Sequence, residues 1–475
     1  MSMQRRSLLK AGLAGAVAGP FAGFTQAPAH GAPRGSGALR PVPDHRDGVV
    51  RLHLPRGFEY RSFHDTADPV TLADGTRLPG RHDGMAAFPD GDGGVVLVRN
   101  HEINNPQPAF GPTAPYDPMG GGGTTTVHVD RYGEVREAYT SLSGTMMNCS
   151  GGPMPWGSWV TCEETVNGPD VGPDFTGAPN TPLQRRHGYV FEVPAGGLAE
   201  AEPLTRAGRF AHEAVSYDPV DGYLYLTEDN FAYPSGFYRY RPARHPGRSG
   251  PLDNEGTLQM LRVVGTDEAH LEARQRPGAT YDVAWVDIAD PDPHFDHTPG
   301  EEAPTSNDEA LTHVGDQGRA QGAAHFSRCE GQVYEDGVVY FTSTQGGGRA
   351  MAGPDSSNGY GNGWGQVWAY DCRAQTLRCV YQSESRQRLD FPDNVTTSPR
   401  GTLVVCEDHD ERNYLRGLTR EGRIWPIARN AIADRTDSEF AGTTFSPDGH
   451  TLFVNIQDAA GLTFAIWGPW ADLGV

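Results

Sequence analysis

The sequence predicts an all-β fold, a six-bladed β-propeller with a loop-rich insertion. The composition is the first indication: 61 Gly and 38 Pro separate short runs of Val, Tyr, Thr and Phe, and long stretches with a 3.6-residue period are scarce. The second is a repeat, in which a glycine turn leads into a short apolar strand that ends in an acid or amide. Radial repetition of small sheets leaves only short, protected edges, so a propeller accommodates such repeats economically.

The repeat occurs six times and marks one expected strand per blade. The repeats cover residues 93–102, 157–164, 222–230, 337–345, 401–409 and 449–457. Their polar ends are Glu102, Glu164, Glu228, Gln345, Glu407 and Gln457. Residues 188–193, 236–240, 365–370 and 422–427 are apolar runs that fit as neighbouring strands in four-stranded sheets.

The interval between the third and fourth repeats is about twice as long as the others. Residues 241–325 fall within it, are rich in Pro, Asp, Glu and Gly, and contain one clear strand candidate at 281–288. We interpret this segment as an irregular insertion between blades.

The amino terminus has the features of an export signal. Arg5 and Arg6 precede a short, mildly apolar run over 11–24 and an Ala-rich region that ends at Ala32. This pattern predicts a twin-arginine signal peptide over residues 1–32 and a single propeller domain over 33–475. The expected partner is the twin-arginine translocase, which exports folded proteins, and the expected location is periplasmic or secreted. A membrane span needs about 20 apolar residues, so we expect a protein without a stable span. We also expect a monomer.

Charge and cysteine content restrict the class of protein further. The net charge of −21 argues against a nucleic-acid partner, which requires a basic surface. It fits cation binding, although a solvated acidic surface explains most of it. Six cysteines in an exported protein suggest at least one disulfide. Cys372 and Cys379 flank a turn-like segment and are the expected pair, whereas Cys149 is expected to be free.

Residues 144–164 carry the strongest candidate site. We expect a loop through Cys149, a turn at Gly151–Pro153 and a strand from Trp156 to Cys162. Successive side chains of a strand face opposite sides, so only one of Glu163 and Glu164 can face a metal or substrate. On this stretch alone, a buried structural cysteine and glutamates at a strand edge are the simpler explanation.

The acids of several repeats strengthen the case for a site. Carboxylates at equivalent strand ends would meet near the central channel, where they would repel one another unless cations were present. Glu213 precedes a further strand, and Arg328 and Glu330 share one face of an extended segment. Oxygen ligands suit calcium, a thiolate selects a softer transition metal, and arginine offers a planar fork for phosphate.

With these motifs in place, the chain resembles the PhoX-type alkaline phosphatases. The resemblance rests on NCSGGPMPWGSWVTCEE at 148–164, VRNHE, FAHEA, FSRCEG, residues 392–395, VVCED and FSPDGHTLFVNIQ, and it covers nearly all of the expected mature chain. It implies a six-bladed propeller that holds a pair of iron ions and several calcium ions, bridged by an oxo group, and that hydrolyses phosphate esters. The chain is shorter than the longer members, which affects substrate range more than the metal cluster.

The resemblance also implies roles for individual residues. Cys149 would be the thiolate ligand of iron, Glu164, Glu213 and Glu330 would supply iron or calcium carboxylates, and Arg328 would hold the substrate phosphate and serve catalysis. The remaining acidic motif positions would be metal ligands without assignment to a particular ion; they are Glu102, Asp393, Glu407 and Asp408.

The predicted function is therefore metal-assisted hydrolysis of small phosphate monoesters. The ions would neutralise the phosphoryl oxygens and generate the nucleophile, with Arg328 stabilising the equatorial oxygens. No serine lies in a G-x-S-x-G frame, which lowers the case for a serine hydrolase. The alternatives are a calcium-dependent lactonase or esterase, and a non-catalytic exported propeller stabilised by calcium. Neither of these two alternative functions requires Cys149 or Arg328.

Overall fold

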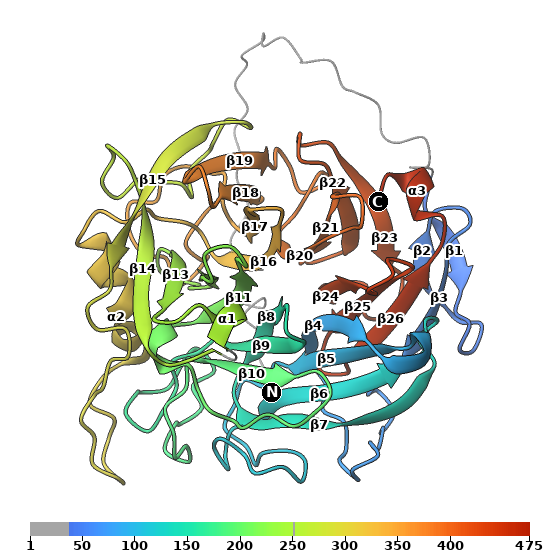
Figure 1. Cartoon of the computed structure of the whole chain (residues 1–475), viewed down its shortest axis with the longest axis horizontal. Coiled ribbons are helices and arrows are strands. Elements are labelled where there is room, and N and C mark those ends of the chain that lie inside the picture. Colours follow the sequence, from blue (N-terminus) through green and yellow to red (C-terminus); the bar gives the residue numbers. More distant parts are fainter. Residues whose placement is uncertain (1–37, 250–251) are drawn as a thin grey trace.

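The computed structural model describes residues 38–249 and 252–475, and these form a ring of antiparallel β-sheets around a common centre (Figure 1). The predicted signal peptide lies outside the described residues. The all-β, propeller-like arrangement predicted from the sequence is confirmed. No helix in the described ranges is long and apolar enough to cross a membrane.

Five hydrogen-bonded sheets make up the ring. The first contains β4 (His82–Pro89), β5 (Val95–His101), β6 (Gly122–Val129) and β7 (Val135–Thr145). The second contains β8 (Asn148–Met154), β9 (Ser158–Glu163) and β10 (Val190–Pro194). The third runs through β11 (His212–Tyr217), β12 (Leu224–Glu228), β13 (Phe237–Pro242), β14 (Gly256–Val263) and β15 (Thr280–Asp287), and continues through β19 (Thr376–Gln382), β18 (Gln366–Asp371), β17 (Val338–Ser343) and β16 (Cys329–Glu335).

The last two sheets combine both ends of the described chain. One contains β20 (Pro392–Thr397), β21 (Leu403–Glu407), β22 (Tyr414–Leu418), β23 (Ile424–Asn430), β2 (Val50–Leu54) and β1 (Arg40–Pro43). The other contains β24 (Glu439–Phe445), β25 (Thr451–Gln457), β26 (Leu462–Trp467) and β3 (Glu59–Phe63). The short helices are α1 (Pro246–Ser249), α2 (Asn307–Arg319), α3 (Trp470–Leu473), and the 3₁₀ turns η2 (Gly91–Gly93) and η3 (Thr205–Ala207).

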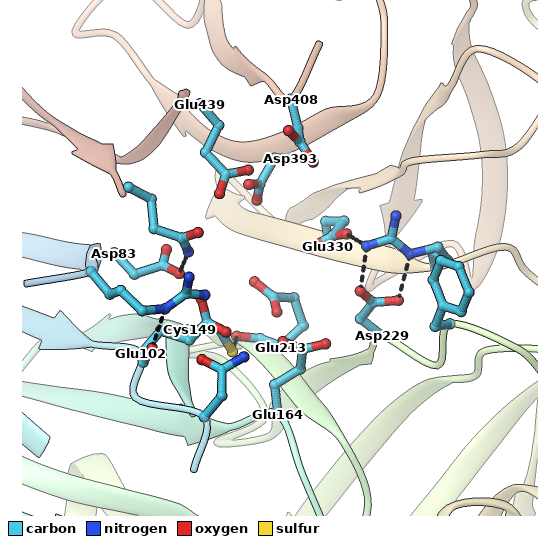
Figure 2. Close-up of a pocket in the computed structure, with 15 residues that line it drawn as sticks. Asp83, Glu102, Cys149, Glu164, Glu213, Asp229, Glu330, Asp393, Asp408 and Glu439 are labelled. Atoms are coloured by element: carbon cyan, nitrogen blue, oxygen red, sulfur yellow. Dashed lines mark hydrogen bonds and ion pairs between the residues drawn. The ribbon is translucent and has the colours of Figure 1, made fainter. Parts of the chain in front are cut away.

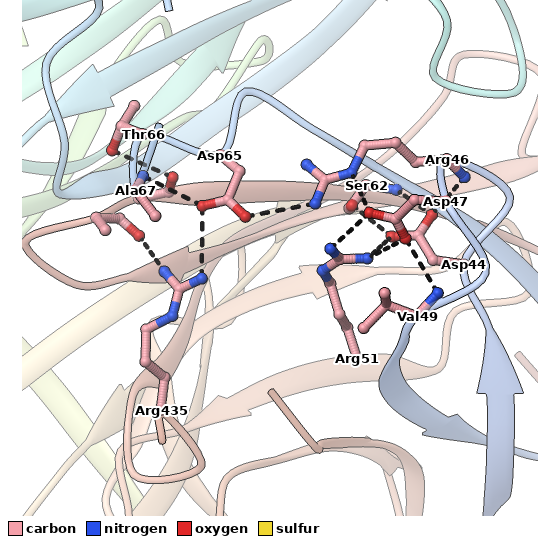
Figure 3. A network of polar contacts seen from close by, with 12 residues as sticks. Asp44, Arg46, Asp47, Val49, Arg51, Ser62, Asp65, Thr66, Ala67 and Arg435 are labelled. Atoms are coloured by element: carbon pink, nitrogen blue, oxygen red, sulfur yellow. Dashed lines mark hydrogen bonds and ion pairs between the residues drawn. The ribbon is translucent and has the colours of Figure 1, made fainter. Parts of the chain in front are cut away.

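The ring is closed by pairing between sequence-distant strands. β3 pairs with β26, and β2 pairs with β23. A network of ion pairs accompanies this closure (Figure 3): Asp65 accepts hydrogen bonds from Arg46 and from Arg435, which precedes β24. Arg51 of β2 binds Asp44 and Asp47 at 2.8 and 2.7 Å. We call this group, Asp44, Arg46, Asp47, Arg51, Asp65 and Arg435, the closure network.

The hydrophobic core is divided among the interfaces between adjacent sheets. One cluster packs Leu52 and Trp425 of the six-stranded sheet against Ile456 and Phe464 of its neighbour. Alternation along each strand sends one set of side chains to each of its two interfaces. Six strands, which we call the first strands, contact one another in the order β4, β8, β11, β16, β20 and β24. The last of them, β24, also contacts β4. They therefore line the centre of the ring.

Most predicted strands are present. The six repeats form β5, β9, β12, β17, β21 and β25, each the neighbour of a first strand. The segment 241–325 is more regular than expected, because it contains β14 and helix α2 in addition to the expected strand, β15. A capping box begins α2, in which Ser306 and Glu309 cap each other's backbone N–H. This helix was not predicted from the sequence, although the S-x-x-E pattern at 306–309 is a capping-box signal.

The prediction of a turn at Gly151–Pro153 is wrong, because these residues continue strand β8. The glycines serve close approach instead: a Cβ at Gly151 would lie 2.0 Å from the Val160 carbonyl oxygen, and one at Gly152 would lie 1.9 Å from that of Val215. Pro153 is tolerated because β8 is the edge strand of its sheet.

The expected disulfide between Cys372 and Cys379 is also contradicted. All six cysteines lie within the described part of the chain as buried free thiols. In the β18–β19 hairpin, Cys379 pairs with Trp368, four positions along the chain from Cys372. Strand residues rise about 3.3 Å each, so the two Cα atoms are roughly 13 Å apart, and a disulfide requires less than about 7 Å.

Candidate active site

All six first strands carry a β-bulge at the same place. In β4, for example, His82 pairs with His101 and Met85 with Arg99, so that β4 holds one residue more than β5. The same shift occurs in β8, β11, β16, β20 and β24. The first bulged residues are Asp83, Cys149, Glu213, Glu330, Asp393 and Gly442. A bulge redirects a side chain, and here the bulges turn five side chains of metal-binding type, one thiol and four carboxylates, toward one pocket.

The sixth strand, β24, differs because its bulge carries Gly442. This residue has φ 60°, and a Cβ there would lie 2.2 Å from the Asp83 carbonyl oxygen. The close approach of β4 thus excludes a side chain at this position. Glu439, at the start of β24, lines the pocket instead.

The backbone before four of the bulges adopts the left-handed conformation. Arg81, Met147, Arg328 and Phe391 each lie two residues before a bulged ligand and have φ between 43° and 47°. This conformation is uncommon for residues other than glycine and is concentrated at functional sites. Arg81 and Arg328 therefore occupy the same backbone position relative to the bulges that follow them.

The pocket at the centre of the ring has a cavity volume of about 90 Å³ and a strong excess of acid. Two guanidinium groups, Arg81 and Arg328, and one thiol, Cys149, line it. Nine carboxylates complete the ionisable lining: Asp83, Glu102, Glu164, Glu213, Asp229, Glu330, Asp393, Asp408 and Glu439. Figure 2 shows these acids arranged around one central space. We refer to it as the carboxylate pocket.

Two groups within this pocket could each hold a metal ion. Ligand atoms of Cys149, Glu164 and Glu213 lie within 4.8 Å of one another, as do those of Glu213, Glu330 and Asp393. Glu213 belongs to both groups, so one carboxylate links the two positions. The first group offers a soft sulfur with two oxygens, and the second offers oxygen alone.

Burial and mutual repulsion act together on the acids of this pocket. Burial, followed by neighbouring carboxylates, raises the pKa of Asp83, Glu213 and Glu330 well above the usual range. Burial, and then the negative charges of Glu213 and Glu164, raise the pKa of the Cys149 thiol. A protein without cations would keep protons on these groups, whereas bound cations would replace the protons and stabilise the charged forms.

Both arginines of the pocket bind carboxylates. Arg328 donates from Nε and Nη2 to the two oxygens of Asp229, at 3.1 and 2.8 Å, and from Nη2 to Glu330 at 3.0 Å. Its Nη1 makes no hydrogen bond to a residue of the described chain. Burial opposes the charge, but Asp229 and Glu330 outweigh it and raise the pKa of Arg328. Arg81 pairs with the Glu102 carboxylate and backbone oxygen.

Glu163 and Glu164 point in opposite directions, as strand alternation requires. Glu164 lines the pocket, whereas Glu163 is fully buried behind it. The Glu163 carboxylate accepts hydrogen bonds from the backbone N–H of Met146 at 2.9 Å and of Gly188 at 2.8 Å, and it binds His187 at 2.6 Å. Burial lowers the pKa of His187, but Glu163 and Asp117 outweigh it and raise that pKa to about 9. These bonds anchor the segment that leads into Cys149.

The structure gathers eight of the nine sequence-predicted site residues in the carboxylate pocket. They are Glu102, Cys149, Glu164, Glu213, Arg328, Glu330, Asp393 and Asp408. Glu407 lies elsewhere, fully buried, with its carboxylate bound by Arg416 Nε at 2.8 Å. The register explains the difference: Glu407 pairs with Pro392 just before a bulge, as Glu163 pairs with Asn148. Glu163, and not Glu164, is therefore the equivalent of Glu407.

Sequence reasoning missed Asp83, Asp229, Glu439 and Arg81. A signal for two of them exists, because Arg81-His-Asp-Gly84 and Arg328-Cys-Glu-Gly331 share the pattern R-x-acid-G. Asp229 directly follows the expected strand of the third repeat, on the opposite face from Glu228. For Glu439 we find no signal in the sequence.

The family model described as alkaline phosphatase PhoX matches residues 37–137 and 132–460. No curated protein matches the chain. A structure of Pseudomonas fluorescens PhoX with vanadate, a transition state analogue, is similar in fold, with a TM-score of 0.63 and 16% identity, covering 92% of this chain and 98% of that one.

Two other solved structures are more distant. A gluconolactonase of Xanthomonas campestris aligns with 11% identity and a TM-score of 0.43, over 90% of this chain and 98% of that one. Virginiamycin B lyase of Staphylococcus aureus aligns with 12% identity and a TM-score of 0.39, over 86% and 99%. The family model spans most of the chain, and on that ground the protein belongs to the PhoX family of alkaline phosphatases and is a phosphatase.

Proposed function

We propose that this protein hydrolyses small phosphate monoesters in the carboxylate pocket, with a pair of iron ions and several calcium ions held by the thiol and the acids. The observation that carries the proposal is Glu213, whose carboxylate belongs to both candidate metal groups. A soft ligand on one side of it and oxygen ligands on the other suit two kinds of ion.

The donor set fits such a cluster. Cys149, Glu164 and Glu213 would hold iron, and Glu213, Glu330 and Asp393 would hold a neighbouring ion, with the remaining acids of the pocket available for calcium. The raised pKa values of Asp83, Glu213 and Glu330 support this, because burial and neighbouring carboxylates disfavour the charged forms and added positive charge favours them. When bound, the ions supply the positive charge that stabilises the phosphoryl oxygens.

The chain's own residues bind and orient the ester. Asp229 and Glu330 hold the Arg328 guanidinium in a fixed plane, and its Nη1 remains available for a phosphoryl oxygen. A fixed, charged donor that needs no reorganisation stabilises the charge that develops during phosphoryl transfer. A solved PhoX structure of similar fold contains vanadate, a transition state analogue, which supports a phosphoryl-transfer site in this fold.

We further propose six blades, obtained by dividing the nine-stranded sheet at the pairing of β15 with β19. This pairing covers only three residue pairs, and each half then begins with a bulged first strand, β11 or β16. The twin-arginine pattern supports export of a folded, metal-loaded monomer to a periplasmic or secreted location.

The test combines metal analysis with hydrolysis of 4-nitrophenyl phosphate by protein purified from the exported fraction. We expect iron and calcium in stoichiometric amounts, and competitive inhibition by inorganic phosphate. Glu213→Gln should lose both metals and activity, whereas the exposed control Glu134→Gln should keep them. Calcium without iron, or activity that survives complete removal of both metals, would contradict the proposal.

A further inference from the structure

A second cavity, of about 430 Å³, adjoins the carboxylate pocket. The two share three lining residues, Glu164, Asp229 and Phe231. The carboxylate pocket itself is much smaller, at about 90 Å³. The second cavity has the size of an ordinary small-molecule site, so the rest of the substrate has a place directly beside the reacting group.

The walls of this cavity are partly apolar. Phe231 stands where the two cavities meet, and its ring centre lies 5.7 Å from the guanidinium carbon of Arg328. Met147, Phe175 and Leu311 add further apolar lining, and Phe175 is 39% exposed. A carbon chain that leaves the phosphoryl group would therefore meet aromatic and aliphatic surface first.

Every ionisable side chain that lines the second cavity is acidic. Asp174 and Asp308 lie in its wall, and Glu164 and Asp229 lie at the junction. Among the described residues, no lysine, arginine or histidine lines it. Arg328 binds Asp229, and Glu164 belongs to a candidate metal group, so the negative charge that a substrate would meet comes from Asp174 and Asp308. These two acids attract a cation and repel an anion.

The start of helix α2 does not offset this charge. Residues 306–308 line the cavity, and a helix amino terminus normally attracts anions. Here Ser306 Oγ accepts the Glu309 N–H at 3.2 Å, and the Glu309 carboxylate accepts the Ser306 N–H at 3.1 Å. Asp308 adds a further carboxylate in the first turn. The chain itself thus already provides hydrogen-bond acceptors and negative charge at the start of this helix.

We propose that the second cavity receives the alcohol part of the substrate and selects phosphomonoesters whose alcohol carries an ammonium group on a short carbon chain. Phe175 and Phe231 present aromatic surface to the cation, and Asp174 and Asp308 provide counter-charge. Esters whose alcohol carries a carboxylate or a second phosphate are disfavoured. The inference rests on the proposed phosphatase function, whose site it extends.

The test compares three esters of similar size that differ in the charge of the alcohol. They are phosphocholine, its uncharged isostere 3,3-dimethylbutyl phosphate, and the phosphate ester of 3-hydroxypropionate. We expect kcat/KM to fall in that order, by at least about tenfold from first to last, and the difference to shrink as salt screens the charges. Equal values for the three esters would overturn the inference.

Two variants locate the effect. Asp308→Lys should shift the ratio of phosphocholine to the carboxylate ester at least about tenfold toward the carboxylate ester. The matched control Asp282→Lys changes an exposed acid of β15 outside both cavities, and should leave the ratio unchanged. Phe175→Ala should lower kcat/KM for phosphocholine several-fold relative to methyl phosphate. Equal ratios in the two lysine variants would overturn the assignment of the cavity.

Hydrolysis of 4-nitrophenyl phosphate by the same metal-loaded preparation separates the two proposals. If it is hydrolysed while the three esters are not distinguished, the subsite is wrong and the phosphatase function stands. If no phosphomonoester is hydrolysed, the proposed function fails and the subsite fails with it.

Discussion

The closure network and the carboxylate pocket are both built from acids and arginines, but in different proportions. In the closure network three aspartates meet three arginines, and hydrogen bonding to Arg51 is the main cause of a lowered pKa at Asp47 (Figure 3). In the carboxylate pocket nine carboxylates and a thiol meet two arginines, and the pKa values of Asp83, Glu213 and Glu330 are raised (Figure 2).

This difference distinguishes an acid cluster that stabilises the fold from one that needs cations from outside. Acids whose charge is balanced by arginines of the same chain need no added cations. The closure network is of this kind and joins segments from the two ends of the described chain. An excess of buried acid destabilises the folded protein unless cations bind, and so it indicates a functional site. Four substitutions or treatments, taken from the largest expected effect to the smallest, test this comparison.

The largest effect is expected from Cys149→Ser, which removes the soft ligand of the pocket. Iron content and its visible absorption should be lost, and activity should fall to background, because the serine hydroxyl is a poorer ligand for iron than the cysteine thiolate. Metal analysis and phosphatase assays measure both. Cys379→Ser, a buried thiol in a hydrophobic interface, is the matched control and should keep iron. A Cys149 variant with full iron content would refute the assignment.

Arg328→Ala should lower kcat/KM for a phosphomonoester by about 10² to 10³, the usual effect of removing one oxyanion donor. Arg328→Lys should restore little, because lysine cannot reproduce the paired bonds to Asp229 while keeping a donor for phosphate. Inhibition by inorganic phosphate tells the two roles apart. Should Arg328 serve only to neutralise Asp229, the variants would lose thermal stability and metal while the phosphate inhibition constant stayed the same.

Metal removal should make stability depend on pH in the direction set by the raised pKa values. Asp83, Glu213 and Glu330 bind protons more tightly when folded, so their contribution is present below the unfolded pKa near 4 and is lost as pH rises. Chelated protein should therefore melt at progressively lower temperature between about pH 5 and pH 8.

Glu228 and Glu407, whose pKa values burial raises to about 7, act in the same direction with or without metal. The difference between chelated and metal-loaded protein therefore isolates the carboxylate pocket. Identical pH dependence of the two forms, measured by thermal melts, would show that the pocket acids do not depend on cations.

The smallest effect on activity is expected from Arg51→Ala in the closure network. The buried Asp44 carboxylate would lose a partner, which typically costs about 1–3 kcal/mol of unfolding free energy. Activity and metal content should stay near those of the wild type, because Arg51 lies outside the carboxylate pocket. Chemical denaturation and metal analysis measure the two. Loss of metal without loss of stability would erase the distinction between the two clusters.

The sequence by itself determined the strands, their repetition and most of the ligand types. Alternation and glycine turns are local, and they located the strands β5, β9, β12, β17, β21 and β25. Cys149, Glu213 and Glu330 were identified as ligands through motifs that resemble those of a known family. The R-x-acid-G pattern shows that even Arg81 and Asp83 were within reach of the sequence.

Only the tertiary structure decided which acids face the centre. A shift of one residue sends a strand side chain to the opposite face, so Glu164 lines the pocket while Glu407, at the position of Glu163, is buried against Arg416. The bulges that redirect the ligands exist only in the pairing of first with second strands. For the same reason Gly151 and Gly152, which resemble a turn in the sequence, belong to a strand: the neighbouring backbone that leaves no room for a Cβ comes from Val160 and Val215.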